Sequence, residues 1–304
     1  MHRSTIAAVA AVSIIALTQV ASAADLPRKA PVYTPPPPPP PVLGWTGFYA
    51  GLNAGYHWSN SSVDTVGTPG PFFVPDTFGP SSDLAAQLAT TSLNAKNNGF
   101  IGGGQIGYNW QFNSWVAGLE ADIQGIAHHN GTDSITLQGN LQPTFPDTIV
   151  STTSVEKQVD WLGTVRGRLG FLATPTLLVY GTGGLAYGEV KANTSIAQTA
   201  TCVYAPLGPC TGGGQTVTYG TTGSFSETRA GWTVGGGLEW MFAPQWSLKG
   251  EYLYYDLGEE TFALPDLVAT VPGHCLGSTC WSAHVESKTR FNGNIARIGV
   301  NYHF

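Results

Sequence analysis

Alternation of apolar and polar residues is the dominant pattern along the chain. Within residues 114–125, every second residue from Trp115 to Ile123 is apolar, while Glu120 and Asp122 occupy positions between them. A helix would scatter both sets around its axis, whereas a β-strand points successive side chains to opposite faces. The pattern therefore predicts a strand with one apolar face and one charged face.

Seven further segments repeat this alternation. The eight predicted strands are residues 45–59, 98–112, 114–125, 159–171, 177–190, 228–242, 246–256 and 290–304. The connections after the second, fourth and sixth strands are short. The other four, rich in Thr, Ser, Gly and Pro, are expected to be long loops where partner binding would evolve; they are residues 60–97, 131–158, 191–227 and 257–289. An even number of strands, with short turns at one end and long loops at the other, is typical of outer-membrane barrels.

The apolar faces carry Trp, Tyr and Phe near the strand ends, as interfacial aromatic girdles do. This placement indicates that the apolar face contacts lipid and that the charged face points into a lumen. Because unpaired backbone N–H and C=O groups are costly in hydrocarbon, the strands must close without an open edge. The expected fold is all-β, an eight-stranded antiparallel transmembrane β-barrel of the outer-membrane type with short periplasmic turns.

Charged residues on the predicted inner face should neutralise one another. The interior of an eight-stranded barrel is just filled by side chains, so we expect at most a narrow water path. Isolated charges in that interior would be costly, so structural pairing is favoured over ion selectivity. The predicted lumen network consists of Glu120, Asp122, Arg166, Arg168, Glu239, Lys249, Glu251 and Arg297.

The N-terminal region predicts export. A basic start precedes an apolar stretch, residues 6–20, and the small residues Ala21-Ser22-Ala23 follow it. This is typical of a secretory signal peptide, residues 1–23, cleaved after Ala23; an uncleaved anchor is the alternative. Residues 24–44 are predicted to form a proline-rich periplasmic linker, and residues 45–304 are predicted to form the barrel. Seven consecutive prolines, residues 35–41, predict a stiff polyproline II spacer, with a docking peptide as the alternative.

Composition excludes some function classes. Only 11% of the residues are charged, against about a quarter in an average soluble domain. The net charge of -6 argues against nucleic acid as a partner, because nucleic-acid binding needs a basic stripe. No window beyond the signal has the roughly 20 apolar residues that a transmembrane helix requires.

Four cysteines fall into two close pairs, Cys202 with Cys210 and Cys275 with Cys280. Because an exported chain meets an oxidising compartment, two local disulfides are the favoured interpretation. The rival is a metal site that would include the neighbouring His274 and His284, although the spacing lacks the second ligand pair usual for zinc.

Two histidines, His128 and His129, follow the third predicted strand near the outer loops. They are weak candidates for binding haem or a metal, and a polar cap at the interface is the alternative interpretation. Nothing in the sequence shows a nucleophile held against a base, so no catalytic residue is predicted.

Three stretches carry a resemblance to a known family: WTGFYAGLNAGYHW at residues 45–58, VDWLGTVRGRLGF at residues 159–171, and the terminal IARIGVNYHF. The chain resembles the outer-membrane β-barrel proteins of Gram-negative bacteria that include major surface antigens, haem-binding proteins and porin-like opacity proteins. The terminal Val300, Tyr302 and Phe304 look like the signal read by the barrel-assembly machinery. The resemblance implies a role in envelope integrity and surface antigenicity and, in some members, haem binding or slow solute diffusion.

Three function classes follow. The first is a structural surface protein with at most a narrow pore, and the second is a barrel that binds or takes up haem or a small solute. The third, a lipid-modifying enzyme, would need a Ser or His facing lipid at the outer rim, whereas His57 and His303 face the lumen in the predicted register. Expected partners are outer-membrane lipids, lipopolysaccharide and the assembly machinery, and we hypothesise that the proline-rich linker reaches the cell wall.

Overall fold

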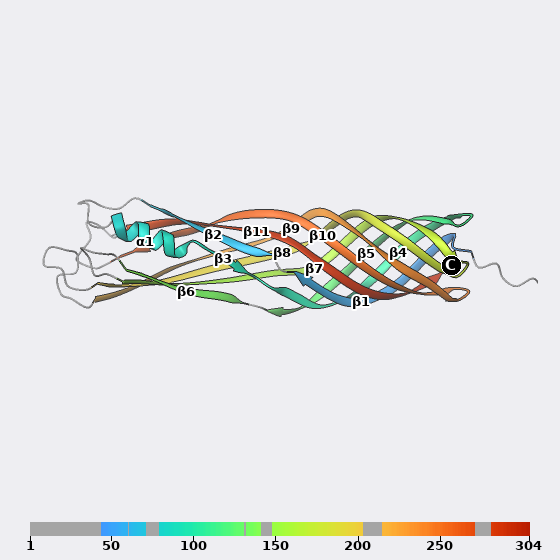
Figure 1. The fold of residues 1–304 in the computed structure, drawn as a ribbon, viewed down its shortest axis with the longest axis horizontal. Helices are drawn as coiled ribbons and strands as arrows, with labels where there is room; N and C mark the ends of the chain where they lie inside the picture. The colour runs from blue at the N-terminus through green and yellow to red at the C-terminus, as the bar shows by residue number, and fades with distance from the viewer. Residues whose placement is uncertain are drawn as a thin grey trace, which may run out of the picture. The chain divides into compact units, whose positions relative to one another are not determined.

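The computed structural model describes residues 44–59, 61–70, 79–130, 132–140, 148–202, 215–270 and 281–304 (Figure 1). The predicted signal peptide and nearly all of the predicted linker lie outside these residues, so both stay predictions. The described residues form eleven β-strands and one helix. None of the helical segments among them is long and apolar enough to cross a membrane.

Eight strands close a ring. Each pairs antiparallel with the next, and the last pairs with the first. In ring order they are β1 (Gly47–Ser59), β4 (Asn97–Phe112), β5 (Trp115–Asn130), β7 (Thr148–Thr174), β8 (Leu177–Cys202), β9 (Gln215–Ala243), β10 (Trp246–Ala269) and β11 (Trp281–His303). The predicted antiparallel outer-membrane barrel class is confirmed, and each predicted strand lies in one member of this ring.

Along the half of the barrel's length nearest the three tight turns, apolar side chains point outward and polar side chains point into the lumen. The outward face of this half, which we call the membrane belt, includes Leu52, Ile106, Leu119, Leu169, Leu238 and Ile298, all more than half exposed. Aromatic pairs border the belt at both levels: Trp115 with Phe171 near the turns, and Trp161 with Tyr187 at the far border. This is the girdle pattern of a barrel surrounded by lipid.

The prediction of four long loops is wrong for most of the described residues in those segments. Strands β7 to β11 have 23 to 29 residues each, against about 9 to 11 needed to cross a bilayer. The same segments hold β2 (Ser62–Pro69), the helix α1 (Gly79–Ala89), β3 (Thr91–Asn94) and β6 (Asp133–Asn140). Threonine favours pleated structure because it is β-branched, so a Thr-rich segment of low charge can extend a strand.

Beyond the belt the ring opens into two sheets, because the pairing of β9 with β10 ends at Trp232 and Asp256 and the pairing of β5 with β7 ends at Gly125 and Trp161. One sheet has the order β6-β7-β8-β9 and the other the order β10-β11-β2-β3, and we call them together with α1 the outer β-sandwich. In Figure 1 these strands run on past the part where all eight lie side by side.

The sidedness of the strands inverts in the outer β-sandwich. Its buried apolar cluster draws on both sheets and on α1; examples are Ile149, Ile196, Tyr219, Leu264, Leu267, Val285, Ala85 and Ala86. Outward positions on the same strands are mostly polar, such as Thr199 and Lys288. The inversion follows from a change of surroundings, since water replaces hydrocarbon outside the ring and apolar side chains then gain by facing inward.

The inverted core gives a test on two neighbouring residues of β10. Leu267 is fully buried and Val268 is 37% exposed. Replacing Leu267 by Ala should destabilise the outer β-sandwich by about 2 to 5 kcal/mol, because it leaves a cavity in the core. The matched Val268→Ala should cost less than about 0.5 kcal/mol. Hydrogen exchange of β10 and β11 in refolded protein measures the difference, and equal costs would contradict the inverted core.

Candidate functional site

The structure places all eight predicted lumen residues inside the ring, each at most 5% exposed. They lie on five strands, at positions where every second side chain points inward. Glu120 and Asp122 lie on β5, Arg166 and Arg168 on β7, Glu239 on β9, Lys249 and Glu251 on β10, and Arg297 on β11.

Arg166 and Arg297 form the centre of this network. Arg166 Nη2 lies 2.5 Å from Glu120 Oε1 and 2.9 Å from Asp122 Oδ2, and its Nη1 lies 2.9 Å from Glu251 Oε1. Arg297 Nη2 lies 2.9 Å from Asp122 Oδ2 and 2.6 Å from Glu251 Oε2. Two guanidinium groups therefore bridge carboxylates from strands on different sides of the ring.

Two further cations complete the network toward the tight turns. Lys249 Nζ lies 2.9 Å from both carboxylate oxygens of Glu120. Arg168 Nη2 lies 2.5 Å from Glu239 Oε2, and Ser247 and Asn301 both donate to Glu239 Oε1. Four carboxylates and four cations thus give a formally neutral interior, which is the condition under which buried charges are tolerated.

Two tyrosines that sequence reasoning left out of the network belong to it. Tyr49 donates to Glu120 Oε2 at 2.6 Å, and Tyr180 donates to Glu251 Oε1 at 3.0 Å. The guanidinium carbon of Arg168 lies 4.4 Å from the ring centroid of Tyr180. The only signal for them in the sequence is their place on inward positions of β1 and β8, because an uncharged residue gives no electrostatic cue.

Apolar layers lie on both sides of the network. Toward the turns, Trp45 is fully buried with Val116, Leu178 and Met241, and its Nε1 donates to the backbone oxygen of Pro175 at 3.1 Å. On the other side a cluster fills the ring; it includes Ile101, Leu162, Leu253, Tyr255, Phe291 and Ile295. Within the described residues, the lumen is therefore packed at three successive levels.

The structure leaves the haem and disulfide predictions open. His128 and His129 pair with Gly99 and Asn98 in the β4–β5 ladder, but their side chains lie outside the described part of the structure. Among the described residues, no group of three or more His, Cys, Asp or Glu side chains is arranged to hold a metal ion.

The remaining site predictions concern cysteines and two other histidines. Cys202 ends β8, and the side chain of Cys202 and the whole of Cys210, Cys275 and Cys280 lie outside the description. His57 and His303 are buried inside the ring, as the predicted register requires. His57 Nε2 lies 2.6 Å from Tyr255 Oη, and His303 Nε2 lies 2.9 Å from Ser247 Oγ.

One buried cation lies beyond the membrane belt, in the outer β-sandwich. Lys157 is 3% exposed, and its ammonium donates to Ser61 Oγ and to the backbone oxygen of Arg290. It also lies 5.0 Å from the ring centroid of Phe291. Burial lowers the pKa of Lys157 to about 7, although the charge of Asp256 acts in the opposite direction.

Comparison with known proteins gives one family for nearly the whole chain. The model of the outer membrane protein beta-barrel domain matches residues 7–304. The 31 kDa outer-membrane immunogenic protein of Brucella melitensis biotype 1 is 34% identical over an alignment 304 residues long, which covers 99% of this chain and 98% of that protein. The 22 kDa outer membrane protein of Rhizobium leguminosarum bv. viciae is 31% identical over 53% of this chain and 56% of its own.

Among solved structures, one similar chain is Ail, the attachment invasion locus protein of Yersinia pestis. It is 12% identical, with 83% of this chain and 99% of that chain covered and a TM-score of 0.25.

Removing a cation from the buried network should lower the free energy of unfolding much more than removing a cation from an exposed ion pair. Arg168→Met should lower the free energy of unfolding by about 3 to 5 kcal/mol, because it leaves the buried Glu239 carboxylate without its cation. Lys191→Met removes one cation from an exposed pair with Asp160 and should cost less than about 1 kcal/mol. Urea unfolding of protein refolded in lipid measures both.

A double variant separates charge balance from packing. Arg168→Met combined with Glu239→Gln should recover part of the loss, since no unpaired ion then remains in the ring. The network account is wrong if the single Arg168 variant costs no more than the Lys191 variant, or if the double variant is the less stable of the two.

Lys157 predicts a pH dependence of the outer β-sandwich. Because its folded pKa is lowered to about 7 from the ordinary 10.5, the unfolded chain binds one more proton between these values. Its contribution to stability is therefore least favourable below pH 7 and rises between about pH 7 and 10.5. Lys157→Met should remove this rise, as measured by hydrogen exchange of β7 across that range, corrected for the intrinsic pH dependence of exchange. An unchanged rise would refute the assignment to Lys157.

Proposed function

The chain belongs to the family of outer membrane protein beta-barrel domains, and from this we propose that it is a non-conducting surface protein of the outer membrane. In this proposal the barrel anchors the outer β-sandwich and contributes to envelope integrity. The observation that supports it is the filled lumen, in which a neutral network lies between two apolar layers. The proposed role includes no catalytic reaction.

The outer β-sandwich supports the part of the proposal that concerns the cell surface. It has its own packed core, so it would present an ordered surface rather than free loops. Relatives of this chain are named outer-membrane immunogenic proteins. We propose by analogy that the outward faces of the outer β-sandwich are the antigenic surface of this chain.

Two partner predictions stay proposals. The terminal Val300 and Phe304 point outward from the ring, and the Tyr302 ring lies 5.1 Å from that of Phe304. An outward aromatic ending would suit reading by the assembly machinery. The proposed contact of the proline-rich linker with the cell wall concerns residues outside the described ones.

Neither alternative function has a comparable observation in its favour. A lipid-modifying activity would need a reactive group facing lipid, whereas His57 and His303 both face inward. A haem-binding role would depend on His128 and His129, whose side chains the structure does not describe.

Planar-bilayer recording tests the proposal. The refolded protein should insert without producing unitary current steps, with or without haem, because side chains of the described residues fill the lumen at three levels. Insertion is verified by protease protection in the lipid vesicles from which the protein is delivered to the planar bilayer, and a large-pore porin serves as the positive control for conductance. Reproducible steps from inserted wild-type protein would contradict a filled lumen.

A further inference from the structure

The two sheets of the outer β-sandwich have contrasting outward faces. The sheet β10-β11-β2-β3 carries exposed charges that pair with one another, such as Lys288 with Glu259 at 2.9 Å and His284 with Asp266 at 2.9 Å. The sheet β6-β7-β8-β9 has sixteen neighbouring outward positions without a charged side chain. We call these sixteen positions the hydroxyl face. These are Ser134, Thr136, Gln138, Asn140, Thr148, Val150, Thr152, Ser154, Ser195, Ala197, Thr199, Thr201, Thr216, Thr218, Gly220 and Thr222.

The hydroxyl face is an ordered array of hydrogen-bonding groups. Neighbouring strands place hydroxyls against each other, as in Thr136 with Thr152 at 2.9 Å and Thr199 with Thr218 at 3.3 Å. Each hydroxyl has one donor and two acceptor sites, so such pairs leave capacity for a ligand. About a quarter of the residues of an average soluble domain are charged, so a charge-free face of this size is a specific feature.

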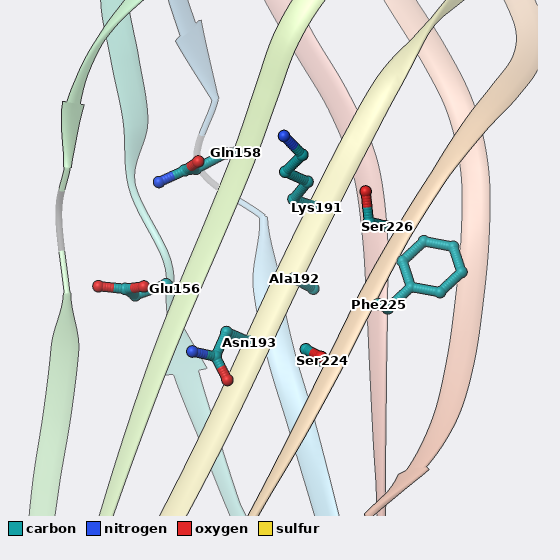
Figure 2. A pocket seen from close by; sticks show the side chains of 8 residues that line it. All are labelled: Glu156, Gln158, Lys191, Ala192, Asn193, Ser224, Phe225 and Ser226. Atoms are coloured by element: carbon teal, nitrogen blue, oxygen red, sulfur yellow. The ribbon is translucent and has the colours of Figure 1, made fainter.

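A groove lies at the end of the hydroxyl face nearest the membrane belt. Its volume is about 240 Å³, and its polar lining comes from three adjacent strands: Glu156, Gln158, Lys191, Asn193, Ser224 and Ser226. Figure 2 shows Glu156 and Gln158 on β7, Lys191 and Asn193 on β8, and the two serines on β9. Asn193 Oδ1 is buried there without a hydrogen-bond partner among the described residues.

The surroundings of this face identify its partner. The groove begins just beyond Trp161 and Tyr187, so the surface is continuous with the membrane belt. A polar group attached to the lipids that contact the belt would therefore lie next to the hydroxyl face. An uncharged array of hydroxyls and amides is complementary to an uncharged polyol. Lys191, 42% exposed at the border, is paired with Asp160 and Glu189.

We propose that the hydroxyl face and its groove bind the saccharide chain of outer-leaflet lipopolysaccharide. This inference rests on the proposed function, because it requires the outer β-sandwich to stand at the cell surface. The saccharide would lie along β7, β8 and β9, with sugar hydroxyls hydrogen-bonded to the exposed Ser224 and Ser226 in the groove. Docked saccharide would also cover the edge of β6 that pairs with no other strand among the described residues.

The experiment compares three probes on refolded full-length protein in detergent micelles: complete lipopolysaccharide, lipid A alone, and the free saccharide released from the same preparation. Complete lipopolysaccharide should bind about tenfold or more tightly than lipid A, and the free saccharide should compete for the difference. Equal affinity for complete lipopolysaccharide and lipid A would overturn the proposal, since the acyl chains or phosphates would then account for binding.

Matched variants locate the binding on one face. Thr152→Glu combined with Thr222→Glu places charge on the hydroxyl face and should bring the affinity ratio near one, while lipid A binding is unchanged. Thr261→Glu combined with Thr68→Glu puts the same two charges on exposed positions of β10 and β2, in the opposite sheet, and should keep the wild-type ratio. If the opposite-sheet variant loses the preference instead, the proposal is wrong.

Hydrogen exchange of the wild-type protein gives a test that needs no variant. Added saccharide should slow exchange in the outer halves of β6 to β9 and not in β2, β10 or β11. Protection that depends on protein concentration rather than on saccharide would identify a second copy of the chain as the occupant and overturn the proposal. Either failure would leave the bilayer recording, and with it the proposed function, unaffected.

Discussion

The structure depends on one constraint, which is that backbone N–H and C=O groups cannot remain unpaired in hydrocarbon. Eight strands meet it by closing a ring, with β11 returning to pair with β1. A ring of eight is so narrow that its interior must be filled by side chains, and the outward face must be apolar. The membrane belt, the buried ion pairs and the packed apolar layers are all consequences of that closure.

The ion network shows how the narrow interior tolerates charge. Arg166 and Arg297 each contact carboxylates from two strands. Tyr49 and Tyr180 donate to carboxylate oxygens that also accept from Lys249 and Arg166, respectively. Such a network links β1, β5, β7, β8, β9, β10 and β11 across the ring. It therefore holds the ring together from inside while leaving no net charge to attract ions, which is consistent with a barrel that anchors rather than conducts.

The sequence was sufficient to predict the strands and the inward charged residues in the part of the molecule that lipid surrounds. Alternation identified the eight ring strands and all eight charged lumen residues, because hydrocarbon separates apolar from charged side chains strongly. It failed for residues 191–202 and 215–227, where Thr and Ser point outward and small apolar residues such as Ala192 and Ala200 point inward. The contrast in hydropathy there is weak and its sign is reversed, so strands were taken for loops. The buried Lys157 was missed for the same reason.

The inversion of sidedness along a single strand is the central claim, and β8 offers the most direct measurement. Leu185 and Thr199 both point outward, the first within the membrane belt and the second in the outer β-sandwich. A spin label introduced at each position through an unnatural amino acid reports accessibility to oxygen and to a water-soluble nickel complex in lipid vesicles. We expect oxygen to dominate at Leu185 and the nickel complex at Thr199. The same environment at both positions would contradict the account.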